Sequence, residues 1–399
     1  MLIEIIIALL LGCLIGTFTG LIPGIHINLI AVILISSLSS FSNIQPIYFA
    51  IFITSLAITH TFLDFIPSVF LGAPDEDTFL SILPGHQMLK LGKAHEAITL
   101  TLYGSLIGIL IILLFTPIFI YAIPLIFNFA KLFLPFILIF ISIYLTLREK
   151  NPIQPLIIFI LSGFLGFATL NLPVKEPLLP LLTGLFGSSA ILISLKNKTK
   201  IPLQEITKIK KIRIPKKDFL KASVSSIISA PLCSFLPGIG SGHAAVIGSE
   251  FIKQSRESFL VLIGAINTIV MGLSFITLYT IGRTRTGAAV AISEILETIT
   301  FQNLLIILFS IVASGILSFF LAINLSKIFA KNINKLNYSY LSIIILLILF
   351  LTTIIFSNLL GILVFITSTS LGIFTILSGA RRINLMGCLL IPTILYYLF

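Results

Sequence analysis

A histidine and an aspartate lie four residues apart within a long apolar stretch of the sequence. His60 and Asp64 are spaced i, i+4, which places both side chains on one face of a helix. An imidazole and a carboxylate so placed shift each other's pKa, so the pair suits a proton relay or a cation site. A buried pair that only fastens helices together is the alternative, and the sequence leaves both open. We take His60 and Asp64 as candidate ion-coupling residues.

Two proline–glycine pairs each interrupt an apolar stretch near its middle. Proline cannot continue the hydrogen-bond ladder of a helix, and glycine tolerates the turn that follows. The half-helix after each break begins with free N–H groups and a positive dipole end, which favour an anion. Carbonyls freed at such breaks favour a cation such as Na⁺ instead. We predict a substrate or ion site here, formed by Pro23, Gly24, His26, Asn28, Pro237, Gly238, Gly240, Ser241, Gly242 and His243.

Three further charged residues lie near the second break or in the connection that follows. Glu250 comes seven residues after His243 and shares its helix face, so it is either an ion-coupling carboxylate or a solvated helix end. Arg283 and Arg285 precede a short predicted helix. Because guanidinium groups bind carboxylates and phosphates in a bidentate manner, we count both arginines as substrate-binding candidates.

The elements that must position these residues cross a membrane. The chain has 399 residues, of which 57% are hydrophobic and only 10% charged. A spanning helix needs roughly 20 apolar residues, so the chain can cross a bilayer about ten times. This excludes a soluble enzyme, a disordered scaffold and a secreted disulfide protein. Besides the broken pairs at 2–40 and 218–254, we predict spans at 47–71, 97–123, 124–147, 153–172, 177–195, 257–281, 300–326, 339–357, 359–378 and 383–399.

Most of the net charge of +11 lies in one segment. Residues 196–217 hold nine Lys or Arg and one Glu, a local charge of +8, and the rest of the chain carries +3. A basic run between two apolar halves is typical of a cytoplasmic loop. Such a loop can bind the headgroups of membrane lipids. We do not expect nucleic acid as a partner.

A shift of 214 residues superimposes two parts of the chain. Residues 21–25 (LIPGI) fall on residues 235–239 (FLPGI), and a stripe of small residues precedes each break. Small residues every four positions let membrane helices pack closely. Five spans in each half would orient the halves oppositely, as in many secondary transporters. We predict an N-terminal membrane repeat at 1–195, a basic cytoplasmic linker at 196–217 and an inverted C-terminal membrane repeat at 218–399.

Signatures of enzymes are missing from the sequence. The three cysteines form no CxxC motif, and no P-loop or zinc-binding HExxH motif occurs. Ser241 and His243 are two residues apart on a predicted helix and face different ways, which disfavours a catalytic dyad. We therefore expect no catalytic residues, no metal site and no cofactor.

Several motifs together resemble one family of membrane proteins, the TctA family. It comprises the large membrane subunit of tripartite tricarboxylate transporters and shorter archaeal homologues. The resemblance covers most of the chain. It rests on PGIHIN at 23–28, GAPDED at 72–77, LPGH at 83–86, LPGIGSGH at 236–243, Arg381-Arg382 and Met386-Gly387.

The resemblance implies an ion-driven permease for carboxylates that works with a small membrane subunit and an external binding protein. We therefore expect an all-α, multi-pass protein of the cell membrane that moves a small anionic solute, coupled to Na⁺ or H⁺. One alternative is a translocator of a lipid phosphate such as polyprenyl phosphate. The other is an intramembrane lipid-modifying enzyme that uses histidine and acidic residues.

Overall fold

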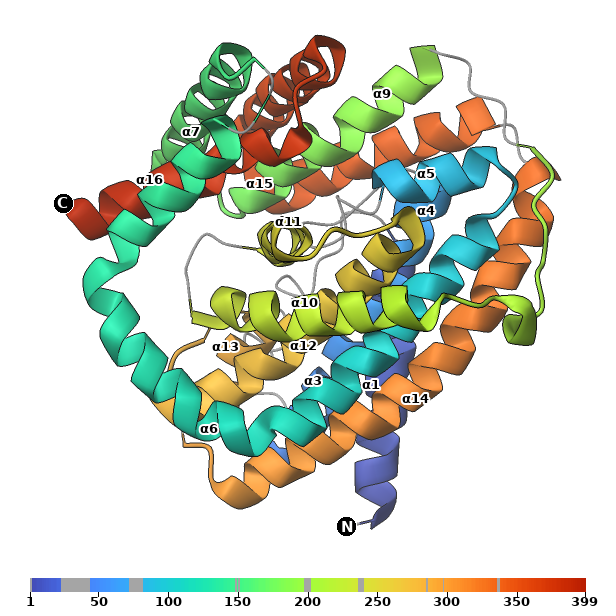
Figure 1. Ribbon diagram of the computed structural model, residues 1–399, viewed down its shortest axis with the longest axis vertical. Coiled ribbons are helices and arrows are strands. Elements are labelled where there is room, and N and C mark those ends of the chain that lie inside the picture. The colour runs from blue at the N-terminus through green and yellow to red at the C-terminus, as the bar shows by residue number, and fades with distance from the viewer. Residues whose placement is uncertain are drawn as a thin grey trace.

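The computed structural model describes residues 2–22, 44–71, 82–147, 149, 151–196, 202–235, 240–284, 286–296, 298–335 and 338–399. All regular elements in these ranges are helical, which confirms the predicted all-α class (Figure 1). In chain order they are α1 (Leu2–Leu21), α3 (Pro46–Leu63), α4 (Phe65–Leu71), α5 (Ile82–Lys90), α6 (Ala94–Leu147), α7 (Ile153–Asn171), α8 (Leu178–Leu182), the π-helix η3 (Thr183–Ser188), α9 (Ser189–Lys196), the 3-10 turn η4 (Ile209–Lys211), α10 (Lys216–Phe235), α11 (Ser241–Phe251), α12 (Arg256–Ile281), α13 (Gly287–Leu296), α14 (Phe301–Asn332), the 3-10 turn η5 (Ile333–Lys335), α15 (Tyr338–Ser378), the 3-10 helix η6 (Arg382–Met386) and α16 (Gly387–Leu398).

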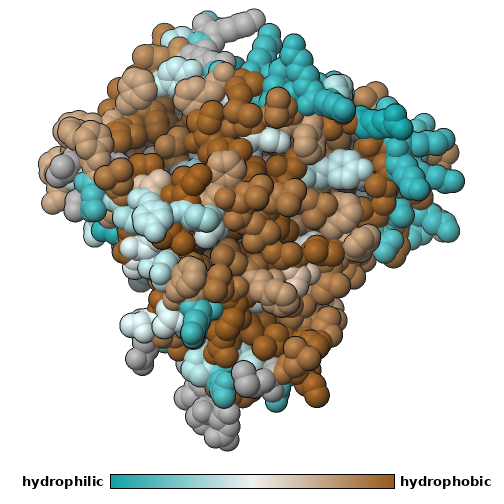
Figure 2. All heavy atoms as spheres, turned by 60° about the horizontal axis from the view of Figure 1, so that its bottom comes forward, coloured by the Kyte–Doolittle hydropathy of each residue, from teal (hydrophilic) through white to brown (hydrophobic). Residues whose placement is uncertain are grey.

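Seven helical segments in the described ranges are long and apolar enough to cross a membrane. Figure 2 shows hydrophobic residues over most of the visible face, with hydrophilic residues gathered toward one edge. An exposed apolar surface of this extent suits contact with lipid tails. The protein is a multi-pass membrane protein, and the segments are Leu2–Leu21, Pro46–Leu71, Ala94–Phe129, Ile153–Asn171, Arg256–Ile281, Phe301–Asn332 and Ser342–Ser378.

The predicted boundary between spans 97–123 and 124–147 is wrong. Both belong to α6, one helix of 54 residues that continues through Pro117, Pro124 and Pro135. A proline inside a helix removes one hydrogen bond and bends the axis, and membrane helices tolerate it where neighbouring groups satisfy the freed carbonyl. Figure 1 shows α6 as a long bowed helix that curves around the other elements.

The predicted break at residue 358 coincides with a kink within α15. Asn358 has φ 62° and ψ −173°, which interrupts the helix. Its side chain stabilises the kink, because Oδ1 accepts a hydrogen bond from Leu360 N at 3.0 Å and Nδ2 donates to Pro173 O at 2.9 Å. The predicted spans at 177–195 and 383–399 are found as short interrupted helices, α8–η3–α9 and η6–α16.

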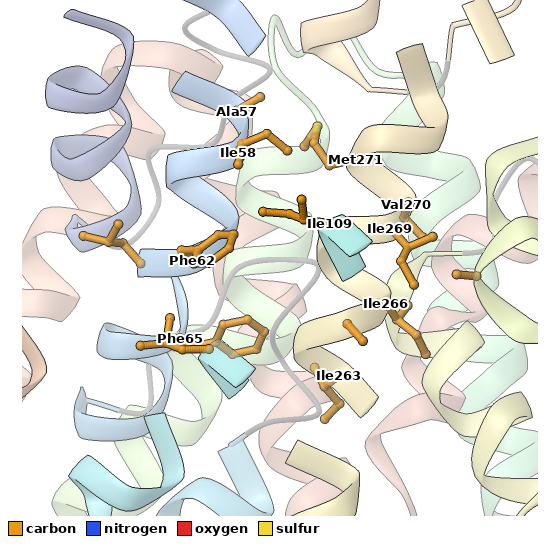
Figure 3. Close-up of a cluster of buried hydrophobic side chains, with 14 of the residues drawn as sticks. Ala57, Ile58, Phe62, Phe65, Ile109, Ile263, Ile266, Ile269, Val270 and Met271 are labelled. Atoms are coloured by element: carbon orange, nitrogen blue, oxygen red, sulfur yellow. The ribbon is translucent and has the colours of Figure 1, made fainter. Parts of the chain in front are cut away.

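The two most enclosed spans, α3–α4 and α12, lie in the core of the protein. Figure 3 shows apolar side chains from α3, α4, α6 and α12 packed into one cluster, including Phe62, Phe65, Ile109 and Ile266. Ser255 caps the start of α12, because its Oγ accepts from Ser258 N at 3.2 Å. Gly282, at φ 63°, ends the helix in the left-handed conformation.

Small residues bring the core helices into close contact. A Cβ added at Gly16 of α1 would lie 2.5 Å from the carbonyl oxygen of Leu56 in α3. A Cβ added at Gly104 of α6 would lie 2.0 Å from the carbonyl oxygen of Val261 in α12. Both distances are shorter than atoms tolerate, so these backbones touch only because side chains are absent. The stripe of small residues therefore does what its spacing predicts.

The 214-residue shift relates elements as well as sequence. It carries the bounds of α1, Leu2–Leu21, onto those of α10, Lys216–Phe235. Helix α1 packs on α3, and α10 packs on α12. The two halves also contact each other in a corresponding manner. Helix α6 of the first half packs on α12 of the second, and α14 of the second half packs on α3 of the first.

The basic linker is fastened to the turn between α5 and α6. Glu205 N donates to Gly92 O at 2.7 Å, and Gln204 Oε1 accepts from Ala94 N at 3.1 Å. Gln204 Nε2 also donates to Leu89 O at 3.0 Å. This part of the linker therefore lies against the N-terminal half.

Candidate functional site

The structure describes only part of the predicted binding residues. Residues Pro23, Gly24, His26, Asn28, Pro237, Gly238 and Arg285 lie outside the described ranges, and His243 is described only as part of the α11 backbone. The residues that can be placed are Gly240, Ser241, Gly242, His60, Asp64, Glu250 and Arg283.

The segment after the second break forms the beginning of α11. Ser241 is 2% exposed, and Gly240 O accepts the first helical hydrogen bond from Ala244 N at 3.2 Å. The thiol of Cys233 in α10 also donates to Gly240 O, at 3.2 Å. Helices α10 and α11 pack against each other, joined further by Ser225 Oγ, which donates to Gly248 O at 3.1 Å. The two helices therefore pack against each other, and the α11 N-terminus at Ser241 is buried.

His60 joins α3 to α1. Its Nδ1 lies 3.0 Å from Thr19 Oγ1, and Thr19 Oγ1 lies 3.2 Å from Gly16 O, its own carbonyl acceptor. A hydroxyl has a single proton, so if Thr19 gives it to Gly16, Nδ1 of His60 is the donor in the other bond. In that tautomer, Nε2 of His60 is left as the basic nitrogen.

Asp64 joins α3 to α12. Its Oδ2 accepts a hydrogen bond from Asn267 Nδ2 at 3.0 Å, and the same amide lies 3.5 Å from Thr61 O. One turn earlier on α3, Thr59 Oγ1 accepts from Ser318 Oγ of α14 at 2.8 Å. We call the set Thr19, Thr59, His60, Asp64, Asn267 and Ser318 the polar junction; it joins α1, α3, α12 and α14.

Proline accounts for the position of Asp64 at a helix end. Pro67 has no N–H, so the carbonyl of Leu63, four residues earlier, loses its usual helical donor. Helix α3 ends at Leu63, with Asp64 as its C-cap, and α4 begins at Phe65. A freed carbonyl beside a carboxylate is a favourable arrangement for a cation.

The polar junction lies in apolar surroundings. His60 and Asp64 are each 3% exposed and Asn267 is 2% exposed. Among the acidic residues that the structure describes, only Asp64 is fully buried. Figure 3 shows the neighbours of Asp64, Phe62 and Phe65, within the hydrophobic cluster. Burial makes a carboxylate costly unless it is hydrogen-bonded or binds a cation or a proton, which is why ionisable groups at such depth are functional candidates.

Glu250 and Arg283 both contact α6, away from its start. Tyr144 OH donates to Glu250 Oε2 at 3.4 Å. The guanidinium carbon of Arg283 lies 4.8 Å from the ring centroid of Phe127, a cation–π contact. Arg283 is exposed. Within the described residues, no group of three or more His, Cys, Asp or Glu side chains is arranged to hold a metal ion.

Sequence reasoning missed Asn267 as the partner of Asp64. The two residues are 203 positions apart, and no local pattern relates them. A signal was nevertheless present, because Asn267 is the only amide side chain in the apolar run 257–281. A side-chain amide buried in a membrane helix needs a polar partner, and Asp64 supplies it here.

Comparison with known proteins shows the family of the chain. The model of the tripartite tricarboxylate transporter TctA family matches residues 6–387. The chain is also similar to an uncharacterized protein of Methanocaldococcus jannaschii, with 33% identity over 404 residues and 98% of each chain covered. No solved structure matches the chain.

Proposed function

Because the chain belongs to the tripartite tricarboxylate transporter TctA family, we propose that it is a permease that moves a small carboxylate anion across the cell membrane, coupled to Na⁺ or H⁺. The observation that supports coupling most directly is the polar junction. It holds Asp64, the one fully buried acid among the described residues, between α3 of the first half and α12 of the second.

In this proposal Asp64 carries the coupling ion. With Asn267 donating to one carboxylate oxygen, the other oxygen and the Leu63 carbonyl can bind Na⁺, or the carboxylate can take up a proton. His60, through Nε2, provides a second acceptor one helical turn away. Glu250 is the more peripheral candidate, because it is only half-buried and its described partner is the hydroxyl of Tyr144.

The anion would bind at the two Pro-Gly breaks. Free N–H groups at the start of each half-helix are the proposed donors, with Ser241 and the side chains of His26, Asn28 and His243. The burial of Ser241 and the close packing of α10 on α11 support an interior position for the second break. Arg283 and Arg285 would attract the anion at an entrance.

Alternating access would follow from rocking of the two halves. The proposal takes 1–195 and 218–399 as repeats of opposite orientation, joined by the linker at 196–217. The exchanged packing, with α6 on α12 and α14 on α3, supports a symmetric relation between the halves. The polar junction lies where these halves meet, so ion binding at Asp64 can bias their relative position. As a tripartite transporter component, the chain would work with a small membrane subunit and an external binding protein.

Uptake into proteoliposomes tests this function. Purified protein is reconstituted, and accumulation of a panel of labelled mono-, di- and tricarboxylates is followed while the Na⁺ gradient and the pH gradient are imposed separately. We expect accumulation of at least one carboxylate that depends on one of the two gradients. Absence of ion-dependent uptake for every carboxylate, in protein that remains folded, would contradict the proposal.

A substitution at the second break tests the location of the anion site. Gly240→Leu places a bulky side chain at the start of α11, so uptake should fall at least about tenfold. Thermal unfolding and size-exclusion chromatography show whether the variant is folded. Normal uptake by folded Gly240→Leu protein would remove this break from the site.

A further inference from the structure

The linker between the two halves is held in place along its described part, residues 202–217. Besides its hydrogen bonds to the turn between α5 and α6, it accepts one from Tyr103 of α6, whose OH donates to Ile209 O at 3.2 Å. Ile212 is buried and belongs to the apolar cluster of the core. Figure 1 shows the linker following the outer edge of the molecule before it enters α10. The linker therefore presents its other side chains at defined places on the surface.

The basic side chains of this segment are exposed and are not neutralised by neighbouring acids. Residues 202–217 hold six bases and one acid, Glu205, and the next acid, Asp218, pairs with Lys221 at 3.5 Å. None of the six bases forms an ion pair within the described part of the chain. Like charges held close together repel one another, so this surface favours an anionic partner. The six exposed bases are Lys208, Lys210, Lys211, Arg213, Lys216 and Lys217.

Exposed apolar side chains accompany these bases. Leu203 is 82% exposed, and Ile206 is exposed as well. Where the linker enters α10, the exposed residues Leu220, Val224 and Ile228 follow at intervals of four and form one apolar stripe along the helix. Bases beside exposed apolar residues are typical of segments that lie in the interface of a membrane. A nucleic acid would neutralise the bases but give these apolar side chains no apolar contact, so the pattern favours lipid.

We propose that residues 202–217 form a binding surface for the anionic headgroups of the membrane lipids around the protein. The bases contact lipid phosphates, and Leu203 and Ile206 enter the apolar layer beneath the headgroups. A cluster of about four to eight bases next to a membrane helix is typical of such a surface, and the linker has six next to α10. The proposal is independent of the solute that the protein moves.

Lipid bound at the linker contacts a segment that joins both halves of the protein. The linker is hydrogen-bonded to the turn between α5 and α6 of the first half and continues directly into α10 of the second. Anionic lipid reduces the repulsion among the exposed bases, and a ligand that binds only the folded state stabilises that state. Anionic lipid should therefore raise the unfolding temperature more than neutral lipid does.

Native mass spectrometry of the full chain in detergent tests the surface. The protein is titrated with phosphatidylglycerol, which is anionic, or with phosphatidylcholine, which has no net charge, and both lipids carry the same acyl chains. We expect phosphatidylglycerol to bind the wild type at least about tenfold more tightly. A linker variant without four of the bases should lose this preference. It carries Lys208→Gln, Lys210→Gln, Lys211→Gln and Arg213→Gln.

A matched control removes the same number and kinds of exposed bases outside the linker. Because it leaves the linker intact, its affinity for phosphatidylglycerol should stay within about twofold of the wild type. The unfolding temperatures of both variants are measured in each lipid, and the stabilisation by phosphatidylglycerol should be lost in the linker variant alone. The control carries Lys175→Gln, Lys253→Gln, Arg256→Gln and Lys331→Gln.

A labelling measurement on the unaltered protein covers the case in which the linker variant fails to fold. An amine-reactive reagent acetylates exposed lysines, and mass spectrometry compares Lys208 and Lys210 with Lys253 in the same sample. Phosphatidylglycerol should slow acetylation of the two linker lysines and leave Lys253 unchanged, and phosphatidylcholine should protect none of them.

Three results would overturn the proposal: equal affinity of the wild type for both lipids, equal losses of affinity in the linker variant and the control, or no protection of the linker lysines. A single-stranded oligonucleotide is titrated in parallel. If it binds through the linker and phosphatidylglycerol does not, the partner is a nucleic acid and the proposal is wrong. Each of these results leaves the proposed transport function standing, because none of them measures solute movement.

Discussion

The helix pairs α1–α3 and α10–α12 pack alike but differ in the chemistry at their contact. In the first pair, Thr19 bonds His60 and Asp64 follows one turn later. The same shift of 214 residues places Cys233, Ser274 and Leu278 at those positions. The second pair therefore keeps the small residues and the packing but has no carboxylate or imidazole there.

The difference indicates what each helix pair contributes. Packing is shared because both pairs need closely approaching backbones, whereas the coupling ion that we propose needs one binding carboxylate. The second half still contributes to the polar junction, because Asn267 reaches from α12 to Asp64. The polar junction thus has its carboxylate and imidazole in the first half and an amide from the second half bonded to the carboxylate. A site shared in this way is expected where ligand binding is coupled to the movement of two halves.

Removing the hydrogen bond that Asn267 of the second half gives to Asp64 should have the largest effect on ion-dependent uptake. Asn267→Ala deletes the donor to Asp64 Oδ2, a hydrogen bond to a charged group worth about 1.5–3 kcal/mol. The half-saturating concentration of the coupling ion in proteoliposome uptake should rise at least about tenfold. Ser55→Ala is the control, since the buried hydroxyl of Ser55 has no hydrogen-bond partner in the described structure. Unchanged ion dependence in folded Asn267→Ala would contradict the shared junction.

Acid should destabilise the folded protein through His86 of the first half. Burial, together with the positive charges of Lys90 and Arg382, lowers the pKa of His86 to about 4 in the folded protein, below the ordinary value of 6.5, so the unfolded chain binds more protons between these pH values. Stability should therefore fall as the pH drops below about 6.5, by roughly 3 kcal/mol in total near pH 4. Thermal unfolding of His86→Gln from pH 7.5 to 4 should show a flatter profile. A profile as steep as that of the wild type would exclude His86 as a cause.

The close backbone contact between α1 and α3 should leave this helix pair little room for added volume. Gly16→Ala forces a Cβ to within 2.5 Å of Leu56 O, and such overpacking costs about 1–3 kcal/mol. The corresponding Ala230→Gly removes a methyl group from α10 and should cost about 1 kcal/mol. The two variants are compared by thermal unfolding in detergent. Unchanged or increased stability of Gly16→Ala would contradict the close contact between α1 and α3.

The smallest effect is expected for the hydroxyl that holds His60. Thr19→Val removes the bond to Nδ1 and should cost about 1 kcal/mol of stability. Cys233→Ser, at the corresponding position, keeps a donor for Gly240 O and should change stability by about 0.5 kcal/mol or less. Equal losses of stability in the two variants would mean that the Thr19–His60 hydrogen bond does not contribute measurably to stability.

Much of the fold follows from the sequence because membrane spans depend on local apolar length. The spans at 47–71 and 257–281 and the break at residue 358 were predictable for that reason. The continuity of α6 was not, because whether a proline bends or ends a helix depends on what packs around it.

The candidate site was predictable only in part. His60 and Asp64 stand out as ionisable residues in an apolar run, and the motifs that indicated the TctA family are confirmed by the match over residues 6–387. The pairing of Asp64 with Asn267, and the approach of Arg382 to the carbonyls of η3, join residues about 200 positions apart. Only tertiary packing brings such residues together.

Asp64 is the residue that we propose couples solute movement to an ion gradient. Asp64→Asn keeps the size of the side chain and its ability to hydrogen-bond but removes the charge. In proteoliposomes, gradient-driven accumulation of the transported carboxylate is measured beside exchange of labelled for unlabelled carboxylate at equal ion concentrations. We predict that Asp64→Asn loses accumulation while exchange continues. Accumulation at the wild-type level by the folded variant would contradict the account.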